Sequence, residues 1–146
     1  MRSMVDHPSV RDRLAAAPAA LASAAHAAPQ EPPAPGEWTP TEIVRHLIAV
    51  EEEVWHRRLG QLQTEEHPRW RWVEPGQWLG APGATLDDVL ATYADLRAST
   101  LSILDDLGPD VWVRTGTHDT FGVLDVAGLM TVAAVHDDEH LASLRR

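Results

Sequence analysis

The sequence predicts an all-α protein whose helices pack as a four-helix bundle. Four segments combine helical propensity with apolar residues spaced three and four apart, and no segment reads convincingly as a strand. The chain has 146 residues, which is enough for one substantial core, so we expect a single domain over residues 1–146. Helices that have no sheet to cover bury their apolar sides against one another, and this favours a bundle.

The first predicted helix spans residues 9–28 and is rich in alanine, the residue with the highest helix propensity. Pro18 interrupts this segment. The helix therefore either kinks at Pro18 or begins there, with the proline in its first turn. Residues 29–36 contain four prolines and a glycine, which predicts a stiff connecting loop.

The second predicted helix has a strong start signal. Thr39 suits the N-cap, Pro40 the first helical position, and Glu42 follows three residues after the cap. We expect the helix to run to about Gln63, with His46 at the edge of its inward side. The apolar residues of that side are Ile43, Leu47, Val50 and Val54.

A long loop and two further helices complete the predicted bundle. Residues 64–84 are rich in proline and glycine and carry Trp70, Trp72 and Trp78, which could roof a pocket but more commonly pack in a core or a dimer interface. The third helix begins at Thr85 and ends before residues 108–109. After a connector, the last helix covers about residues 124–144. Its inward side contains Leu129, Val132 or Ala133, His136 and His140.

Charge and composition exclude several classes of function. A net charge of −10 without a basic patch disfavours binding to nucleic acid. The chain has no apolar run of membrane-spanning length and no signal-peptide core, so we expect a cytoplasmic protein that does not bind membranes. The absence of cysteine excludes disulfides, thiolate metal ligands and a cysteine nucleophile. Any thiol chemistry would need a thiol from a small molecule.

Three histidines are the candidate metal ligands. His136 and His140 lie four residues apart and therefore on one helix face, and His46 lies on an inward edge of another helix. Three neutral imidazoles that leave a coordination position open are typical of catalytic metal sites. Imidazole suits zinc, nickel, copper and iron alike. The alternative is that this pair arises by chance among eight histidines and lies at the core edge, hydrogen-bonded to carboxylates.

Three other residues are candidates for catalysis. Glu53, seven residues after His46, could orient a ligand, or it could be a solvated member of the acidic run 51–53. Tyr93 and Arg97 share a face of the third helix and could contact an anionic thiol or substrate. For Arg97 the alternative is an internal ion pair with its stem packed on the core.

Four further polar residues are expected to have minor roles. Asp137 and Glu139 flank the histidine pair and are interpreted as surface charge, and His56 is expected to be exposed. His118 could border the mouth of a pocket, although a simple turn residue is the favoured interpretation.

Two stretches resemble the hallmark segments of the DinB-like superfamily. In residues 33–47 a Trp38-Thr39 turn opens a helix that carries His46-Leu47, and residues 136–141 supply the closing histidine pair. Arg97 also suits the pattern, and the resemblance extends from about residue 10 to the end of the chain. It implies a four-helix bundle in which His46, His136 and His140 bind a divalent metal ion, with zinc or nickel preferred.

The resemblance also implies an activity. Characterised branches are thiol transferases or thiol-dependent isomerases that use bacillithiol, mycothiol or glutathione, and many other members have no established activity. We therefore expect a metal-dependent enzyme that transfers a low-molecular-weight thiol to an electrophilic small molecule, with Glu53, Tyr93 and Arg97 assisting. A metal ion held by three imidazoles would bind the thiol as thiolate.

Two other functions remain open at this point. The first is a non-catalytic metal-binding, stress-response bundle that acts as a homodimer. The second is a metal-assisted hydrolase, which ranks last because the sequence offers no general base beyond Glu53.

Overall fold

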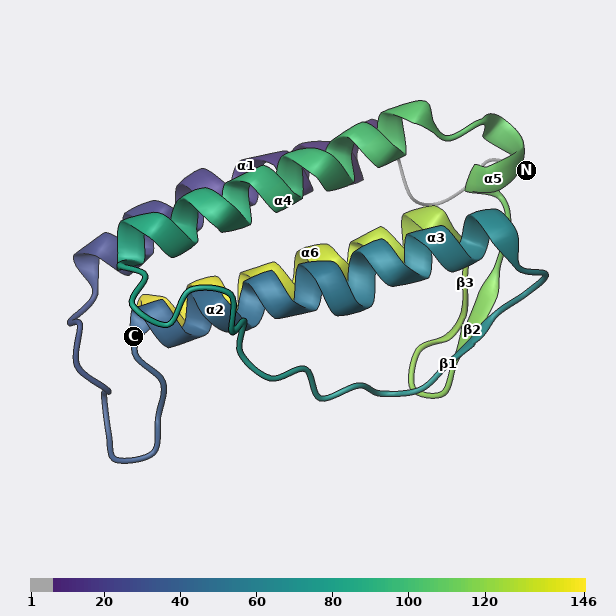
Figure 1. The fold of residues 1–146 in the computed structure, drawn as a ribbon. Helices are drawn as coiled ribbons and strands as arrows, with labels where there is room; N and C mark the ends of the chain where they lie inside the picture. Colours follow the sequence, from purple (N-terminus) through teal and green to yellow (C-terminus); the bar gives the residue numbers. More distant parts are fainter. Residues whose placement is uncertain (1–6) are drawn as a thin grey trace.

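A computed structural model describes residues 7–146 as a bundle of helices with a small sheet at one end (Figure 1). The helical elements are α1 (His7–Ala27), α2 (Pro40–Val50), the π-helical η1 (Glu51–His56), α3 (Arg57–Thr64), α4 (Leu86–Asp106), α5 (Pro109–Trp112) and α6 (Val126–Leu144). The strands are β1 (Arg69–Trp70), β2 (Gly116–His118) and β3 (Gly122–Leu124). Because α2, η1 and α3 follow one another without a break, they form one continuous rod.

The helices are arranged in two pairs. In Figure 1, α1 and α4 form the upper part of the bundle, and the α2–η1–α3 rod and α6 form the lower part. The most extensive backbone packing joins α1 with α6, α2 with α4 and α1 with α4. Buried leucines such as Leu14, Leu59 and Leu129 fill the half of the interior near the sheet, and Leu21 and Leu47 belong to the cluster in the other half. The four-helix bundle predicted from the sequence is confirmed.

Two capping boxes begin α2 and α4, as the sequence predicts. The Thr39 hydroxyl accepts the Glu42 N–H at 3.1 Å, and the Glu42 carboxylate accepts the Thr39 N–H at 3.0 Å. Thr85 and Asp88 exchange equivalent bonds of 3.2 and 2.9 Å. Each box satisfies two N–H groups that a helix start would otherwise leave unpaired.

The π-helical segment η1 is a departure from the uniform helix expected in this region. In a π-helix the hydrogen bonds run over five residues instead of four, so the side chains that follow are rotated relative to α-helical spacing. Glu51 and Trp55 of this segment are buried. The expectation that His56 is exposed is wrong: its ring is half-buried, and its Nε2 lies 2.6 Å from the Thr100 hydroxyl.

The segments expected to be plain loops contain three short strands. β1 pairs with β2 in parallel, and β2 pairs with β3 antiparallel. Trp70 and His118 are direct partners in this sheet and therefore lie on the same face. Gly116 is required here, because a Cβ at this position would lie 2.6 Å from the Trp70 ring. The strands have only two or three residues each, which explains why they leave no alternating pattern in the sequence.

A buried ionic cluster, which we call the Arg97 hub, crosses the bundle interior. The Arg97 Nε and Nη2 atoms donate to the two Glu51 oxygens at 3.0 Å each. Its Nη1 and Nη2 atoms donate to the two Asp137 oxygens at 2.8 and 3.1 Å. The hub is completed by the hydroxyls of Tyr93, which donates to Asp137, and Thr100, which donates to Glu51.

The hub corrects the interpretation of Asp137 as surface charge, since only 4% of this residue is exposed. The reason is that α6 packs against α1 on one side and faces the α2–η1–α3 rod on another, so two of its faces are buried. Burial raises the pKa of Asp137, and Arg97 opposes this effect. Burial alone would lower the pKa of Arg97, but its bonds to Glu51 and Asp137 outweigh burial and raise it.

Pro18 leaves a backbone carbonyl free to become the third partner of Arg97. The residue lies inside α1, which runs through it from His7 to Ala27, so the helix does not begin at the proline. Because proline has no N–H, the Leu14 carbonyl one turn earlier lacks its usual helical donor. Arg97 Nη1 donates to that carbonyl at 2.9 Å. One guanidinium on α4 is thus bonded to α1, η1 and α6.

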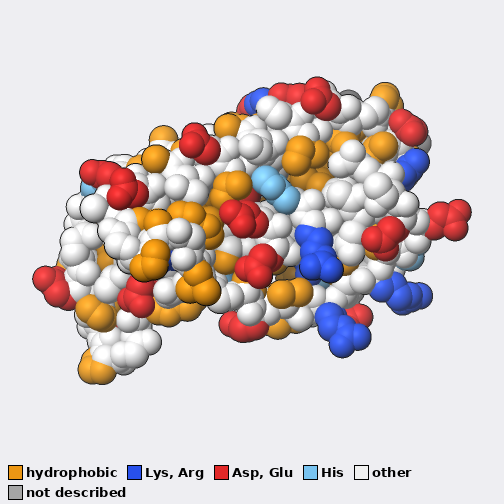
Figure 2. All heavy atoms as spheres, in the orientation of Figure 1, with side chains coloured by type: hydrophobic (Ala, Val, Ile, Leu, Met, Phe, Trp, Pro, Cys, Tyr) orange, Lys and Arg blue, Asp and Glu red, His pale blue; other side chains and the backbone are white. Residues whose placement is uncertain are grey.

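The surface carries several exposed apolar side chains. On the face that Figure 2 shows, apolar side chains in general gather mainly toward the end of the molecule that holds the start of α2, with arginines toward the α3 end. The most exposed are Leu79, Val113, Val123 and Trp72. Within residues 7–146, no helix is both long and apolar enough to cross a bilayer. The homodimer stays a prediction.

The hub predicts a large loss of stability on removal of its cation. Arg97→Met would leave Glu51 and Asp137 as buried charges without a cationic partner, which typically costs about 3–5 kcal/mol. Chemical denaturation of the metal-free protein measures the change. Arg11→Met is the control, because it removes an exposed ion pair with Asp105 and should shift the denaturation midpoint little. Equal small shifts in both variants would contradict the role of the hub.

Candidate metal centre

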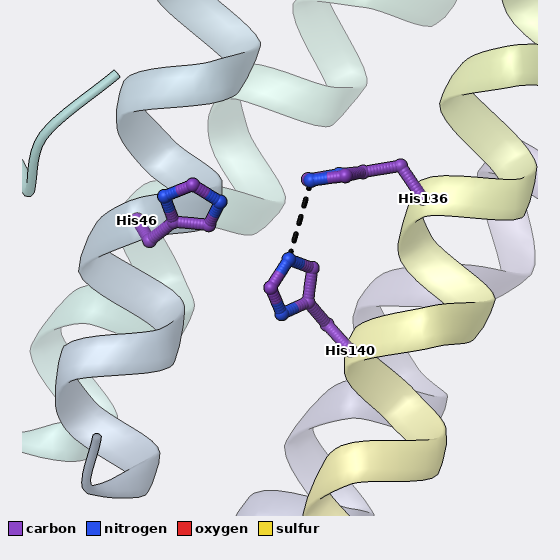
Figure 3. A group of neighbouring side chains, drawn as sticks. All are labelled: His46, His136 and His140. Carbon is purple, nitrogen blue, oxygen red and sulfur yellow. Dashed lines mark hydrogen bonds between the residues drawn. The ribbon is translucent and has the colours of Figure 1, made fainter. Parts of the chain in front are cut away.

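Three imidazoles from two helices converge at one point (Figure 3). His46 comes from α2, and His136 and His140 come from successive turns of α6. Their possible ligand nitrogens all lie within 4.8 Å of one another. The ring of His46 lies 5.6 Å from that of His136 and 5.0 Å from that of His140, measured between centroids. The structure thus brings together the three residues selected from the sequence.

The donor atoms of this trio fit a divalent cation. The Nε2 atoms of His136 and His140 face each other at 3.2 Å. Two nitrogens bound at about 2.1 Å to a tetrahedral zinc ion lie about 3.4 Å apart, which is close to that separation. The Nδ1 atoms of His46 and His136 are buried without a hydrogen-bond partner. Among the described residues none of the three rings bonds to a carboxylate, contrary to the core-edge alternative.

The three imidazoles are held neutral, as metal ligands must be. Burial, followed by the neighbouring His140 and His46, lowers the pKa of His136 to about 3. Burial and His46 lower the pKa of His140 to about 4. Burial also lowers the pKa of His46, although the Gly76 backbone partly offsets it. At neutral pH all three rings therefore keep a lone pair free for a cation.

The trio lines the wall of a cavity of about 680 Å³, a volume typical of sites for small molecules. The walls are mostly apolar and aromatic, from Trp38, Val50, Val54, Trp55, Trp72, Val73, Pro75, Phe121, Val132 and Val135. Trp38 packs on His46 with a centroid distance of 4.9 Å, and Trp55 packs on His136 at 6.2 Å. The polar wall residues besides the trio are Arg58, Glu74, His118, Thr131 and Glu139.

The three residues expected to assist catalysis lie elsewhere. Glu53 is exposed and does not line the cavity, because it lies two residues from the buried Glu51 and therefore on another side of the helix. Tyr93 and Arg97 are each 1% exposed and belong to the hub, so the ion-pair alternative for Arg97 is the one the structure shows. Their contact with the site is indirect, through Asp137 beside His136.

Two cavity residues were overlooked or ranked low in the sequence. Arg58 extends the series His46, Val50, Val54 at steps of four, and this spacing was a signal that could have revealed it. His118 is buried in β2 and lines the cavity, so the less favoured interpretation of this residue is the correct one.

The tryptophans of the loop before α4 have three different environments. Trp72 lines the cavity and is 63% exposed. Trp70 is buried in β1, and its indole N–H donates to Gln61 at 2.9 Å. Trp78 packs on the guanidinium of Arg45, which donates to the Trp78 carbonyl at 2.7 Å. Only Trp72 of these three lines the described cavity.

The metal site predicts a defined stoichiometry. Untagged protein incubated with zinc or nickel and then dialysed should retain about one equivalent by elemental analysis, because the three converging imidazoles can surround only one ion. His46→Ala and His140→Ala should each lose it. His26→Ala, which changes an exposed histidine of α1, should retain it. Full metal content in His46→Ala would place the bound metal elsewhere.

The depressed pKa values predict a pH-dependent stability of the metal-free protein. The unfolded chain binds protons at histidine near pH 6.5, whereas folded His136 and His140 stay neutral to about pH 3 and 4. The free energy of unfolding should therefore fall as the pH drops below about 6.5, by at most about 1.4 kcal/mol per pH unit for each histidine. His136→Gln should flatten this slope in denaturation curves. Equal slopes in parent and variant would contradict the burial of a neutral ring.

Comparisons with known proteins agree with the fold. The profile of the DinB superfamily matches residues 9–144. YfiT from Bacillus subtilis, described as a probable metal-dependent hydrolase with an unusual four-helix bundle topology, has a TM-score of 0.75 at 20% identity, over 99% of this chain and 88% of that one. TT2238, described as a four-helix bundle protein, has a TM-score of 0.65 at 26% identity, over 94% and 97%. No curated protein sequence matches. The chain belongs to the DinB superfamily.

Proposed function

We propose that this protein is a metal-dependent enzyme that transfers a low-molecular-weight thiol to an electrophilic small molecule. The observation that carries the proposal is the convergence of three neutral imidazoles on the wall of an apolar cavity. His46, His136 and His140 would hold the ion, for which zinc or nickel is preferred. The thiol would be of the mycothiol, bacillithiol or glutathione type.

The ion would supply one chemical effect. A divalent cation held only by neutral ligands keeps its full charge when bound, and that charge lowers the pKa of a thiol that enters the site. The absence of cysteine in the 146 residues means that this thiol comes from a small molecule. Thiol and acceptor would share one cavity, and holding them together there lowers the entropy cost of their reaction.

The residues of the chain prepare the site in three ways. Trp38 and Trp55 pack on His46 and His136 and so restrict their rings. The apolar walls exclude water, which strengthens electrostatic effects inside the cavity. The Arg97 hub joins η1, which continues the helix of His46, to Asp137, which follows His136. It thereby fixes the relative position of the two helices that carry the ligands.

A second candidate function is metal-assisted hydrolysis. It is favoured by the likeness to YfiT, which is described as a probable metal-dependent hydrolase. A carboxylate is also available at the site, because Glu139 is exposed, as the sequence interpretation expects, and lies at the cavity wall. Glu139 precedes His140 and lines the cavity, where it could act as a general base.

The proposed activity predicts thiol-dependent turnover. Protein loaded with zinc or nickel is mixed with glutathione, bacillithiol or mycothiol and with 1-chloro-2,4-dinitrobenzene, and the conjugate is followed by absorbance. At least one thiol should react about tenfold or more faster than without protein, because general effects of proximity and thiol activation exceed this factor. The acceleration should disappear after metal removal and in His46→Ala.

The same assay separates the alternatives. Metal-dependent cleavage of an activated ester without any thiol, abolished in Glu139→Gln, would favour the hydrolase. Full metal binding with no turnover in either assay, together with a tight dimer in solution, would favour a non-catalytic metal-binding bundle. No thiol-dependent conjugation with any of the three thiols would contradict the proposed function.

A further inference from the structure

The end of the cavity near the sheet carries two buried hydrogen-bond donors. Arg58 of α3 is 6% exposed and His118 of β2 is 2% exposed, and both line the cavity. In the described part of the chain neither side chain forms an ion pair with a carboxylate, in contrast to the buried Arg97. A largely desolvated guanidinium without a counter-ion is energetically costly, so its retention calls for an explanation.

Arg58 is held in place but is not saturated. Its guanidinium carbon lies 6.0 Å from the ring of Trp55 and 5.6 Å from that of Trp70. Its Nη2 donates to the Arg71 carbonyl at 3.1 Å. The Nε and Nη1 atoms of Arg58 have no hydrogen-bond partner among the described residues. Both remain accessible to solvent, unlike the buried Nδ1 atoms of His46 and His136. The guanidinium therefore keeps donors free beside the cavity.

His118 has a defined proton position. Its Nδ1 accepts the backbone N–H of Thr120 at 2.9 Å and that of Phe121 at 3.4 Å. Because Nδ1 acts as acceptor, the neutral ring must carry its proton on Nε2. That N–H has no partner within the described residues and is not sealed from solvent. His118 thus offers a second free donor to the same cavity.

The two donors lie close to each other. Trp70 contacts Arg58 and is the direct strand partner of His118, so the three side chains meet on one face of the sheet. The charge of Arg58 also acts on His118 electrostatically, adding to the effect of burial on its ring.

The charges in the cavity are separated along its length. Glu139 adjoins His140 in sequence, and the carboxylate of Glu74 acts electrostatically on His46, so both acids belong to the metal end. Trp55 lies between the two ends. Its ring is 6.2 Å from that of His136 and 6.0 Å from the Arg58 guanidinium carbon, so these two groups are at most about 12 Å apart.

We propose that Arg58 and His118 form an anion subsite that binds the carboxylate of the ligand in this cavity. A guanidinium with free N–H groups is well suited to an oxyanion, and the apolar wall between the two ends suits an apolar body. The inference rests on the proposed function and names its substrate class. That class is an amphipathic small molecule whose carboxylate lies within about 12 Å of its reacting atom. The carboxylate belongs to either the thiol or the acceptor.

Calorimetry on the metal-free protein tests the subsite with two matched pairs of probes. The first pair is 4-phenylbutanoate and 4-phenylbutanamide, and the second is glutathione and its diethyl ester. At least one acid should bind about tenfold more tightly than its neutral partner, as expected for a hydrogen bond to a charged group. Selectivity in the first pair assigns the carboxylate to the acceptor, and selectivity in the second assigns it to the thiol.

Two neighbouring arginines provide matched variants. Arg58→Gln should abolish the preference for the acid. Arg57→Gln changes the same charge at the adjacent, exposed position and should leave the preference intact. Arg58→Lys, which keeps the charge but loses the planar donors, should retain part of it. Circular dichroism checks that each variant is folded.

The proposal is overturned if wild-type protein binds the acid and the neutral probe equally in both pairs, or if it binds neither acid. It is also overturned if Arg57→Gln loses the preference for the acid as Arg58→Gln does. The wild-type comparison stands even if Arg58→Gln fails to fold. Elemental analysis of the same samples keeps the two proposals distinct. Arg58→Gln should still bind one equivalent of metal. If wild-type protein binds no metal, the proposed metal-dependent activity is refuted, whereas the preference for the acid probe still tests the anion subsite.

Discussion

The structure depends on one buried guanidinium. Arg97 projects from α4 and is bonded to the Leu14 carbonyl of α1, to Glu51 of η1 and to Asp137 of α6. Two carboxylates and an unpaired carbonyl are costly to bury, and one planar donor with five N–H groups satisfies all three. Only the native arrangement of the helices brings these groups together, so the hub favours that arrangement over other packings of amphipathic helices with similar apolar content.

The candidate site is built beside this hub, where α2 and α6 face each other across the imidazoles. Asp137 and His136 are adjacent on α6, so the hub and the trio share one helix turn but lie on different sides of it. The cavity beyond the trio is apolar in its middle and polar at both ends, with Arg58 at the end near the sheet. This distribution favours a ligand with two polar ends, and it ties the proposed chemistry to a definite class of molecule.

Local sequence signals predicted most of the fold and the three histidines that the structure brings together. The capping box at Thr39 and the spacing of His136 and His140 are properties of single helices, which a sequence displays directly. Features that arise from contacts between distant segments were not predictable in this way. Pro18 was expected to kink the first helix or to begin it. The sequence does not reveal that the donor to the Leu14 carbonyl lies 83 residues away, on another helix. Asp137 looked exposed because the sequence does not reveal that α6 has two buried faces.

The central claim is that the trio of His46, His136 and His140 forms one metal site between two helices. X-ray absorption spectroscopy at the metal edge of zinc-loaded protein tests it most directly. The account predicts scattering from three imidazoles with nitrogen at about 2.0–2.1 Å in the parent, and a loss of that signal in His46→Ala. A zinc shell made mainly of oxygen, or an identical spectrum in parent and variant, would show that the metal does not bind at the trio.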